Sequence, residues 1–152
     1  GLGGGVMPMA AAIARNDWDI APDRALGHYT HEKSPLGAAA ALATIEVIED
    51  EQLVSRADEL GKRATARLRE LQKEIPLISD VRALGLAIAV ELTRDGQKAT
   101  AEAERVMYNC LSRGLSFKVS AGNVLTLTPP LVITDAEMDT ALDILTVVLR
   151  SV

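Results

Sequence analysis

The order of secondary structure expected after Pro76 is the feature that most constrains the fold of this chain. Short apolar runs predict strands, apolar spacings of three and four residues predict helices, and Gly114 and the Thr134-x-x-Glu137 capping box mark a helix end and a helix start. The expected order is strand (80–84), strand (86–92), helix (98–113), strand (115–119), strand (123–127) and a last helix opened at Thr134. This order predicts an α+β domain, with helices on one side of a mainly antiparallel sheet.

Two helices are expected before that domain. Ser34 and Pro35 are typical of an N-cap and a first helical residue, and leucines and alanines spaced by three or four from Leu53 onward predict a second helix that Pro76 ends. The apolar segment 6–15 is typical of a buried strand whose partner strands lie outside this chain. We therefore expect a division near residues 50–52, with residues 1–50 belonging to a larger body.

The composition argues against several classes of function. A net charge of −5 over 152 residues argues against a nucleic-acid partner, because phosphate binding favours a basic surface. No apolar stretch is long and charge-free enough to span a bilayer, and we expect neither a membrane partner nor a metal site. Cys110 is the only cysteine, which excludes a disulfide within the chain and favours a cytoplasmic setting. A small buried apolar residue is the preferred interpretation of Cys110 over a nucleophile.

Three motifs follow one another along the chain, and residues 82–92 add a fourth segment. The motifs are Gly1-Leu2-Gly3-Gly4-Gly5-Val6-Met7-Pro8-Met9-Ala10, Thr30-His31-Glu32-Lys33-Ser34-Pro35-Leu36-Gly37-Ala38 and Asn123-Val124-Leu125-Thr126-Leu127-Thr128-Pro129-Pro130-Leu131. In this order they resemble the C-terminal part of the class III (ornithine/4-aminobutyrate type) aminotransferases, which use pyridoxal phosphate. The resemblance runs from Gly1 to the end of the chain.

The resemblance implies a fold for each part of the chain. Residues 51–152 are expected to form the small C-terminal α+β domain of the fold-type I pyridoxal-phosphate-dependent transferases. Residues 1–50 are expected to form the end of the large cofactor-binding domain, with its last strand, its phosphate loop and the start of the helix that links the two domains.

The glycine run at Gly1–Gly5 bears on catalysis. In this family the run follows the lysine that holds pyridoxal phosphate as a Schiff base, so the resemblance implies that this lysine immediately precedes Gly1 and that no catalytic residue lies in the chain. The backbone beside a lysine that must swing has to be tight and unobstructed, which glycine allows. The other interpretation is that this glycine run is only a flexible start of the chain. We expect the 152-residue chain alone to be inactive and not to bind the cofactor.

Three neighbouring residues are candidates for cofactor and substrate contact. Thr30 matches the family threonine that reaches the cofactor phosphate of the other subunit, which implies a homodimer; the alternative is a threonine that bonds only its own turn. Tyr29 and His31 flank it, and we expect them near the substrate.

Thr126 is where the chain departs from the family. Many members carry an arginine at this position, which binds the substrate carboxylate through two hydrogen bonds. Threonine cannot supply that charge, and its alternative role is that of an ordinary strand residue. We therefore expect Thr126 near the substrate, with two possibilities left open. The substrate is an amine, amide or lactam, or another arginine (Arg82 or Arg113) takes over.

The resemblance implies transamination between a small amino donor and a keto acid in the full-length enzyme. A racemase or epimerase of the same fold is the alternative that Thr126 keeps open. A hypothesis of another class is a non-catalytic unit that folds and packs against a partner.

Overall fold

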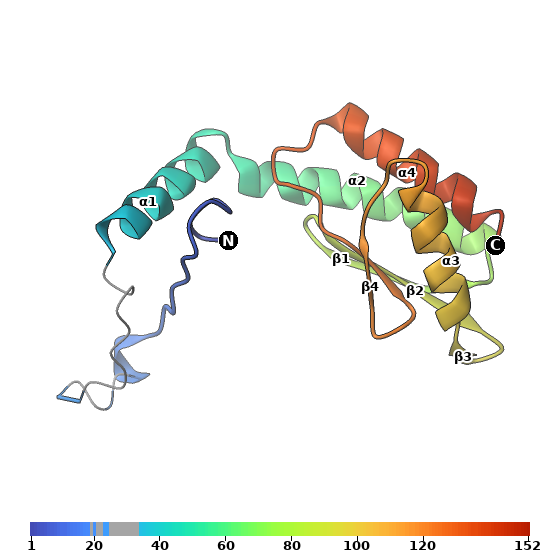
Figure 1. Cartoon of the computed structure of the whole chain (residues 1–152), viewed down its shortest axis with the longest axis horizontal. Coiled ribbons are helices and arrows are strands. Elements are labelled where there is room, and N and C mark those ends of the chain that lie inside the picture. Colours follow the sequence, from blue (N-terminus) through green and yellow to red (C-terminus); the bar gives the residue numbers. More distant parts are fainter. Residues whose placement is uncertain (19, 21–22, 25–33) are drawn as a thin grey trace. The chain divides into compact units, whose positions relative to one another are not determined.

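The computed structural model describes residues 1–18, 20, 23–24 and 34–152 of the chain (Figure 1). The chain divides into two compact units, Gly1–Gln52 and Leu53–Val152. The division follows helix α1 (Pro35–Asp50), where Gln52 adopts a positive φ of 52° before helix α2 (Leu53–Glu74) begins. A left-handed residue cannot continue a right-handed helix, so the helical region breaks at this point.

The second unit contains the predicted order of elements, with one addition. After α2 come the strands β1 (Ile78–Leu84), β2 (Ala87–Arg94) and β3 (Gln97–Lys98), helix α3 (Thr100–Leu111), strands β4 (Lys118–Ser120) and β5 (Val124–Leu127), and helix α4 (Asp135–Leu149). The short strand β3 was not expected from the sequence. It pairs with the end of β2, Lys98 opposite Thr93, so α3 starts at Thr100 and not at Lys98.

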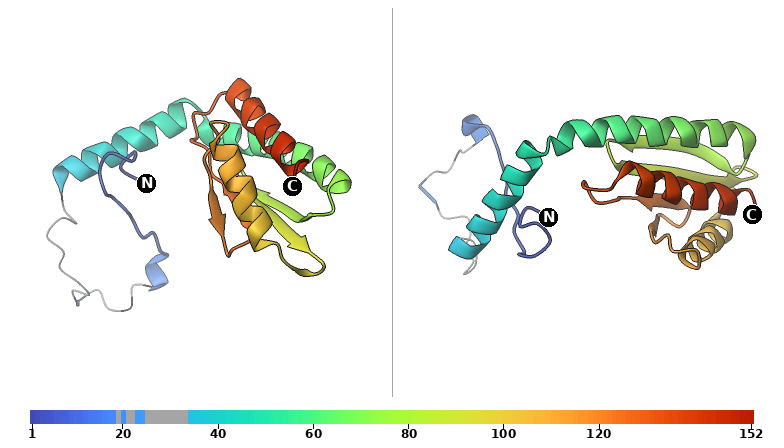
Figure 2. Two further views of the ribbon diagram at one scale, coloured as in Figure 1. Left: turned by 45° about the vertical axis from the view of Figure 1, so that its right-hand side comes forward. Right: turned by 90° about the horizontal axis from the view of Figure 1, so that it is seen from above.

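The sheet is antiparallel throughout, with the order β1-β2-β5-β4 and β3 beside β2. Burial alternates along β2: Ile88, Val90 and Leu92 are buried and the residues between them are not. Helices α2, α3 and α4 lie on the buried side (Figures 1 and 2). The prediction of helices on one side of a mainly antiparallel sheet is confirmed. We call the other surface of the sheet the open face; Arg82, Ala89, Thr126, Lys118 and Ser120 lie on it.

The core between the helices and the sheet is almost entirely aliphatic. Helix α2 supplies one buried stripe, with the three- and four-residue spacing predicted from the sequence: Ala57, Leu60, Ala64, Leu68 and Leu71. Helix α4 begins with the predicted capping box, in which the Thr134 hydroxyl accepts from the Glu137 N–H and the Glu137 carboxylate accepts from the Thr134 N–H. Leu115 and Phe117 pack against the core, and the pairing of β4 with β5 begins only after them. Strand β4 therefore starts at Lys118 and not at Leu115.

In the first unit, α1 starts where the sequence predicts. Ser34 is the N-cap and accepts a hydrogen bond from the Gly37 N–H at 3.3 Å, and Pro35 is the first helical residue. Residues 6–15 form no strand in this unit. Apart from one bridge between Gly3 and Met7, these residues have no strand partner, and Val6 and Ile13 are exposed. The strand expected over 6–15 needs partner strands from outside this chain, so it stays a prediction.

Among the described residues, no helix is long and apolar enough to cross a membrane.

Candidate functional site

The glycine run forms a tight turn at the start of the chain. The Gly4 N–H donates to the Gly1 carbonyl at 3.0 Å and the Met7 N–H donates to the Gly3 carbonyl at 3.1 Å. Gly4 and Gly5 have positive φ values of 67° and 78°. A Cβ added to Gly3 would collide with the Met7 backbone. This turn therefore requires glycine at Gly3, where any side chain would meet backbone.

Thr30, Tyr29 and His31, predicted near the cofactor and the substrate, lie outside the described residues. Their roles stay predictions. The described residues end before them at Arg24 and resume at Ser34, the cap of α1.

Thr126 lies in the middle of the sheet, on the open face. Its strand β5 is held between β2 and β4, so Thr126 stands opposite Ala89 on one side and Lys118 on the other. The Thr126 hydroxyl is half-buried and lies 2.9 Å from the Ser120 hydroxyl, with which it forms a hydrogen bond. Thr126 is thus part of a small polar group and is more than an isolated strand residue.

Of the two alternative arginines, only Arg82 shares this surface. Arg82 stands opposite Ala89, which in turn stands opposite Thr126. Its guanidinium already donates to Asp80 at 2.6 Å and to Glu91 at 2.8 Å, and these hydrogen bonds to the two carboxylates raise the pKa of Arg82. Arg113 lies in the turn after α3 and belongs to no strand of the sheet.

Cys110 is fully buried in the core on α3. Burial raises the pKa of its thiol to about 11, with the Arg113 charge opposing the shift. The thiol therefore stays protonated at neutral pH, which agrees with the prediction of a packing residue over a nucleophile.

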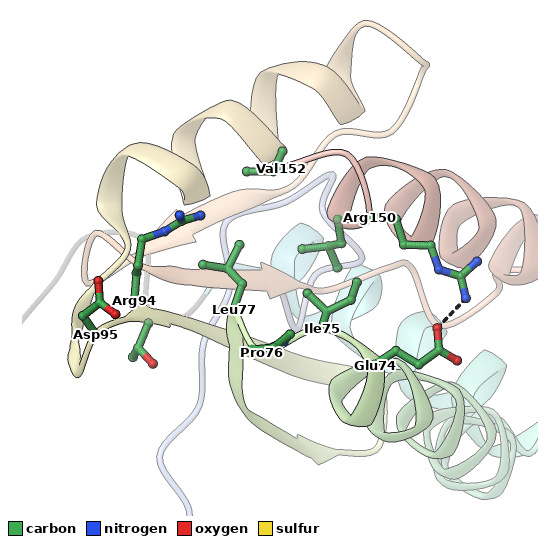
Figure 3. Close-up of a pocket in the computed structure, with 10 residues that line it drawn as sticks. Glu74, Ile75, Pro76, Leu77, Arg94, Asp95, Arg150 and Val152 are labelled. Atoms are coloured by element: carbon green, nitrogen blue, oxygen red, sulfur yellow. Dashed lines mark hydrogen bonds and ion pairs between the residues drawn. The ribbon is translucent and has the colours of Figure 1, made fainter.

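Two clefts of the second unit do not bring catalytic groups together. One of about 540 Å³ lies beyond the end of β2, and Arg94 and Arg150 are among its lining residues (Figure 3). Arg150 is paired with Glu74 at 2.6 Å and Arg94 with Glu102 at 3.0 Å, so neither is available to a ligand without losing its partner. Another of about 600 Å³ lies at the β1–β2 turn and is mostly apolar. Within the described ranges, no three His, Cys, Asp or Glu side chains gather as metal ligands.

The comparisons with known proteins decide the family. The model of the family described as aminotransferase class III matches residues 1–149. The chain belongs to this family. This match confirms the resemblance that the four sequence segments indicated. Class III aminotransferases use pyridoxal phosphate.

The relatives of this class III chain carry out different reactions. It is 48% identical over 147 residues to the (R)-1-hydroxy-2-aminoethylphosphonate ammonia-lyase of Vibrio splendidus, covering 95% of this chain and 31% of that protein. It is 40% identical to the leucine/methionine racemase of Thermococcus litoralis, covering 93% of this chain and 32% of that protein. The chain thus spans about a third of the length of these curated relatives.

A solved structure of a phospholyase from Arthrobacter in complex with phosphoethanolamine is also similar. It superposes with a TM-score of 0.74 at 30% identity, covering 78% of this chain and 29% of that one. The fold of this class III chain is therefore that of the pyridoxal-phosphate-dependent transferases.

Two polar residues beside Thr126 were not found from the sequence. Ser120 and Lys118 come next to Thr126 only through the pairing of β4 with β5. Their spacing of two within one short strand is a weak local signal that they share a face. Nothing in the sequence gives the register that places them opposite Thr126.

Proposed function

We propose that this chain is the C-terminal part of a pyridoxal-phosphate-dependent class III enzyme that transfers an amino group from a small donor to a keto acid. The observation that carries the proposal is the family match over residues 1–149. When bound, the cofactor withdraws electrons from the carbon that bears the amino group. The domain assignment belongs to the same proposal: residues 1–50 complete the cofactor domain and residues 51–152 form the small domain.

Three parts of this chain would serve that site. The turn at Gly1–Gly5 would leave room beside the covalently bound lysine, which we place immediately before Gly1 in the complete protein. The clash expected at Gly3 supports a turn selected for close backbone packing. Thr30 would hold the cofactor phosphate of the partner subunit in a cytoplasmic homodimer, and Tyr29, His31 and Thr126 would lie near the substrate. The chain alone would be inactive, because it lacks that lysine.

A second candidate is an ammonia-lyase that acts on an amine with a phosphate or phosphonate group. Two observations favour it: the 48% identity to a phosphonate ammonia-lyase, and Thr126 at the position where many family members bind a carboxylate. The racemase relative, at 40% identity, keeps racemisation as the alternative within the family.

Product analysis of the full-length enzyme distinguishes these reactions. A transaminase consumes the amine only when a keto acid is added and releases no free ammonia. A lyase releases one ammonia per amine without a keto acid, and a racemase changes only the configuration of the substrate. We expect amine consumption that requires both the added keto acid and the cofactor, with no release of free ammonia. Two results would contradict the proposal. One is amine consumption that does not change when the cofactor is removed, and the other is the absence of transamination, ammonia release and racemisation with all the amines tested.

A further inference from the structure

The polar group around Thr126 has the layout of a small binding surface. Lys118 and Ser120 alternate along β4 and so point to the same side of the sheet as Thr126, with Lys118 directly opposite it. Cβ atoms of directly opposed residues lie about 5 Å apart. The ammonium of Lys118 can therefore reach a ligand that sits on the two hydroxyls.

The two hydroxyls leave one proton free to bind a ligand. The Thr126 and Ser120 oxygens lie 2.9 Å apart, so one O–H donates to the other oxygen. Whichever hydroxyl donates, the second O–H has no acceptor among the described residues. The pair is half-buried, which excludes part of the competing water and strengthens a hydrogen bond to an anion.

Lys118 and Arg82 differ in their availability. Arg82 is held by Asp80 and Glu91 at one side of Ala89. In the part of the chain that the structure describes, Lys118 has neither a carboxylate within 4.0 Å nor a hydrogen-bond acceptor for its ammonium. The open face therefore carries one neutralised cation and one cation that can still pair with an anion.

We propose that Lys118, Ser120 and Thr126 bind the phosphate or phosphonate group of an amine substrate. This inference rests on the function proposed above and names its substrate class. A tetrahedral dianion has three oxygens, which can accept hydrogen bonds from one ammonium and two hydroxyls at once, and lysine binds phosphate as a compact point charge. The open face offers this set of donors around Thr126.

The first test measures binding without turnover. Amide chemical shifts of the 152-residue chain are followed by NMR during titration with phosphoethanolamine and, separately, with ethanolamine. We expect saturable shifts in residues 118–120 and 124–126 with phosphoethanolamine only, which Lys118→Met and Ser120→Ala abolish. Lys98→Met is the matched control, because Lys98 lies on the same sheet and donates to the Ala121 carbonyl at 3.0 Å. Shifts that are absent, or that persist in both variants, would overturn the inference.

The second test uses the full-length enzyme. Lys118→Met and Ser120→Ala should each lower kcat/KM for phosphoethanolamine by about tenfold or more, because each removes a hydrogen bond to a charged group. Both should change kcat/KM for 4-aminobutyrate less than about twofold, and Lys118→Arg should retain most of the wild-type value. Equal losses with both amines would show a structural role and contradict the inference. If the enzyme acts on no amine at all, the proposed function fails, and the NMR titration still decides this inference.

Discussion

At the scale of single residues, Gly61 of α2 lies directly against the backbone of Gly85 at the β1–β2 turn. A Cβ on Gly61 would collide with the Gly85 carbonyl, so helix α2 and the β1–β2 turn touch without a side chain between them. The sequence alone does not show that Gly61 is a residue that must lack a side chain. Gly85 itself needs its glycine for another reason, a positive φ of 53°.

We therefore expect Gly61→Ala to destabilise the fold. Alanine favours the helix by about 1 kcal/mol over glycine, but overpacking at this contact should cost more, for a net loss of about 1–2 kcal/mol. Urea denaturation of the variant measures the free energy of unfolding. Lys62→Ala, on the exposed side of the same helix, is the control and should change little. A Gly61→Ala variant as stable as the wild type would show that the contact can open without cost.

At the scale of elements, α2 and α4 are joined along their exposed edges by ion pairs between residues far apart in the sequence. Arg63 donates to Asp135 at 2.9 Å, Arg56 donates to the other Asp135 oxygen at 3.1 Å, and Arg67 pairs with Asp143. Hydrogen bonds from Arg63 and then Arg56 hold the pKa of Asp135 below its ordinary value. Asp135 is also in the first turn of α4, where the helix dipole favours a negative charge.

The lowered pKa of Asp135 predicts how the stability of the fold changes with pH. Its contribution to stability is fully present above the pKa of an aspartate in the unfolded chain, about 3.9, and is lost as the pH falls through the lower folded value. We expect Asp135→Asn to lower the midpoint of thermal unfolding at pH 7 in low salt, and the difference from wild type to shrink at pH 3 or in high salt. Asp58→Asn, which removes an exposed pair within α2, is the control. A difference that stays constant across pH and salt would exclude the ion pairs as its cause.

The elements could be predicted where their signals are local. Ser34 with Pro35, the stop at Pro76 and the box of Thr134 and Glu137 each fix a helix boundary through contacts within a few residues. The strand expected over 6–15 stays a prediction, because a strand is defined by its partners and those expected for it lie outside this chain.

The candidate site could be predicted only in part, for the same reason. Thr126 stands out in the sequence as a departure from the family. Ser120 and Lys118 join it through the register of β4 on β5, and Arg82 joins the open face through two further pairings. These pairings depend on the packing of the whole sheet, which no local pattern encodes.

At the scale of the whole molecule, the two units differ in how well they bury their apolar residues. Leu53–Val152 has its own aliphatic core, whereas the first unit leaves Val6, Ile13, Trp18 and Ile20 exposed. A unit with so little core gains little stability from its own packing. This contrast supports the proposal that residues 1–50 complete a larger cofactor domain, in a protein about three times the length of this chain in its relatives.

The most direct test of that account is to locate the covalent attachment of the cofactor in the complete protein. The protein is loaded with pyridoxal phosphate, reduced with borohydride and digested, and the labelled peptide is identified by mass spectrometry. The account predicts one labelled lysine, immediately before Gly1. A label on a lysine within residues 1–152, or no label at all, would contradict it.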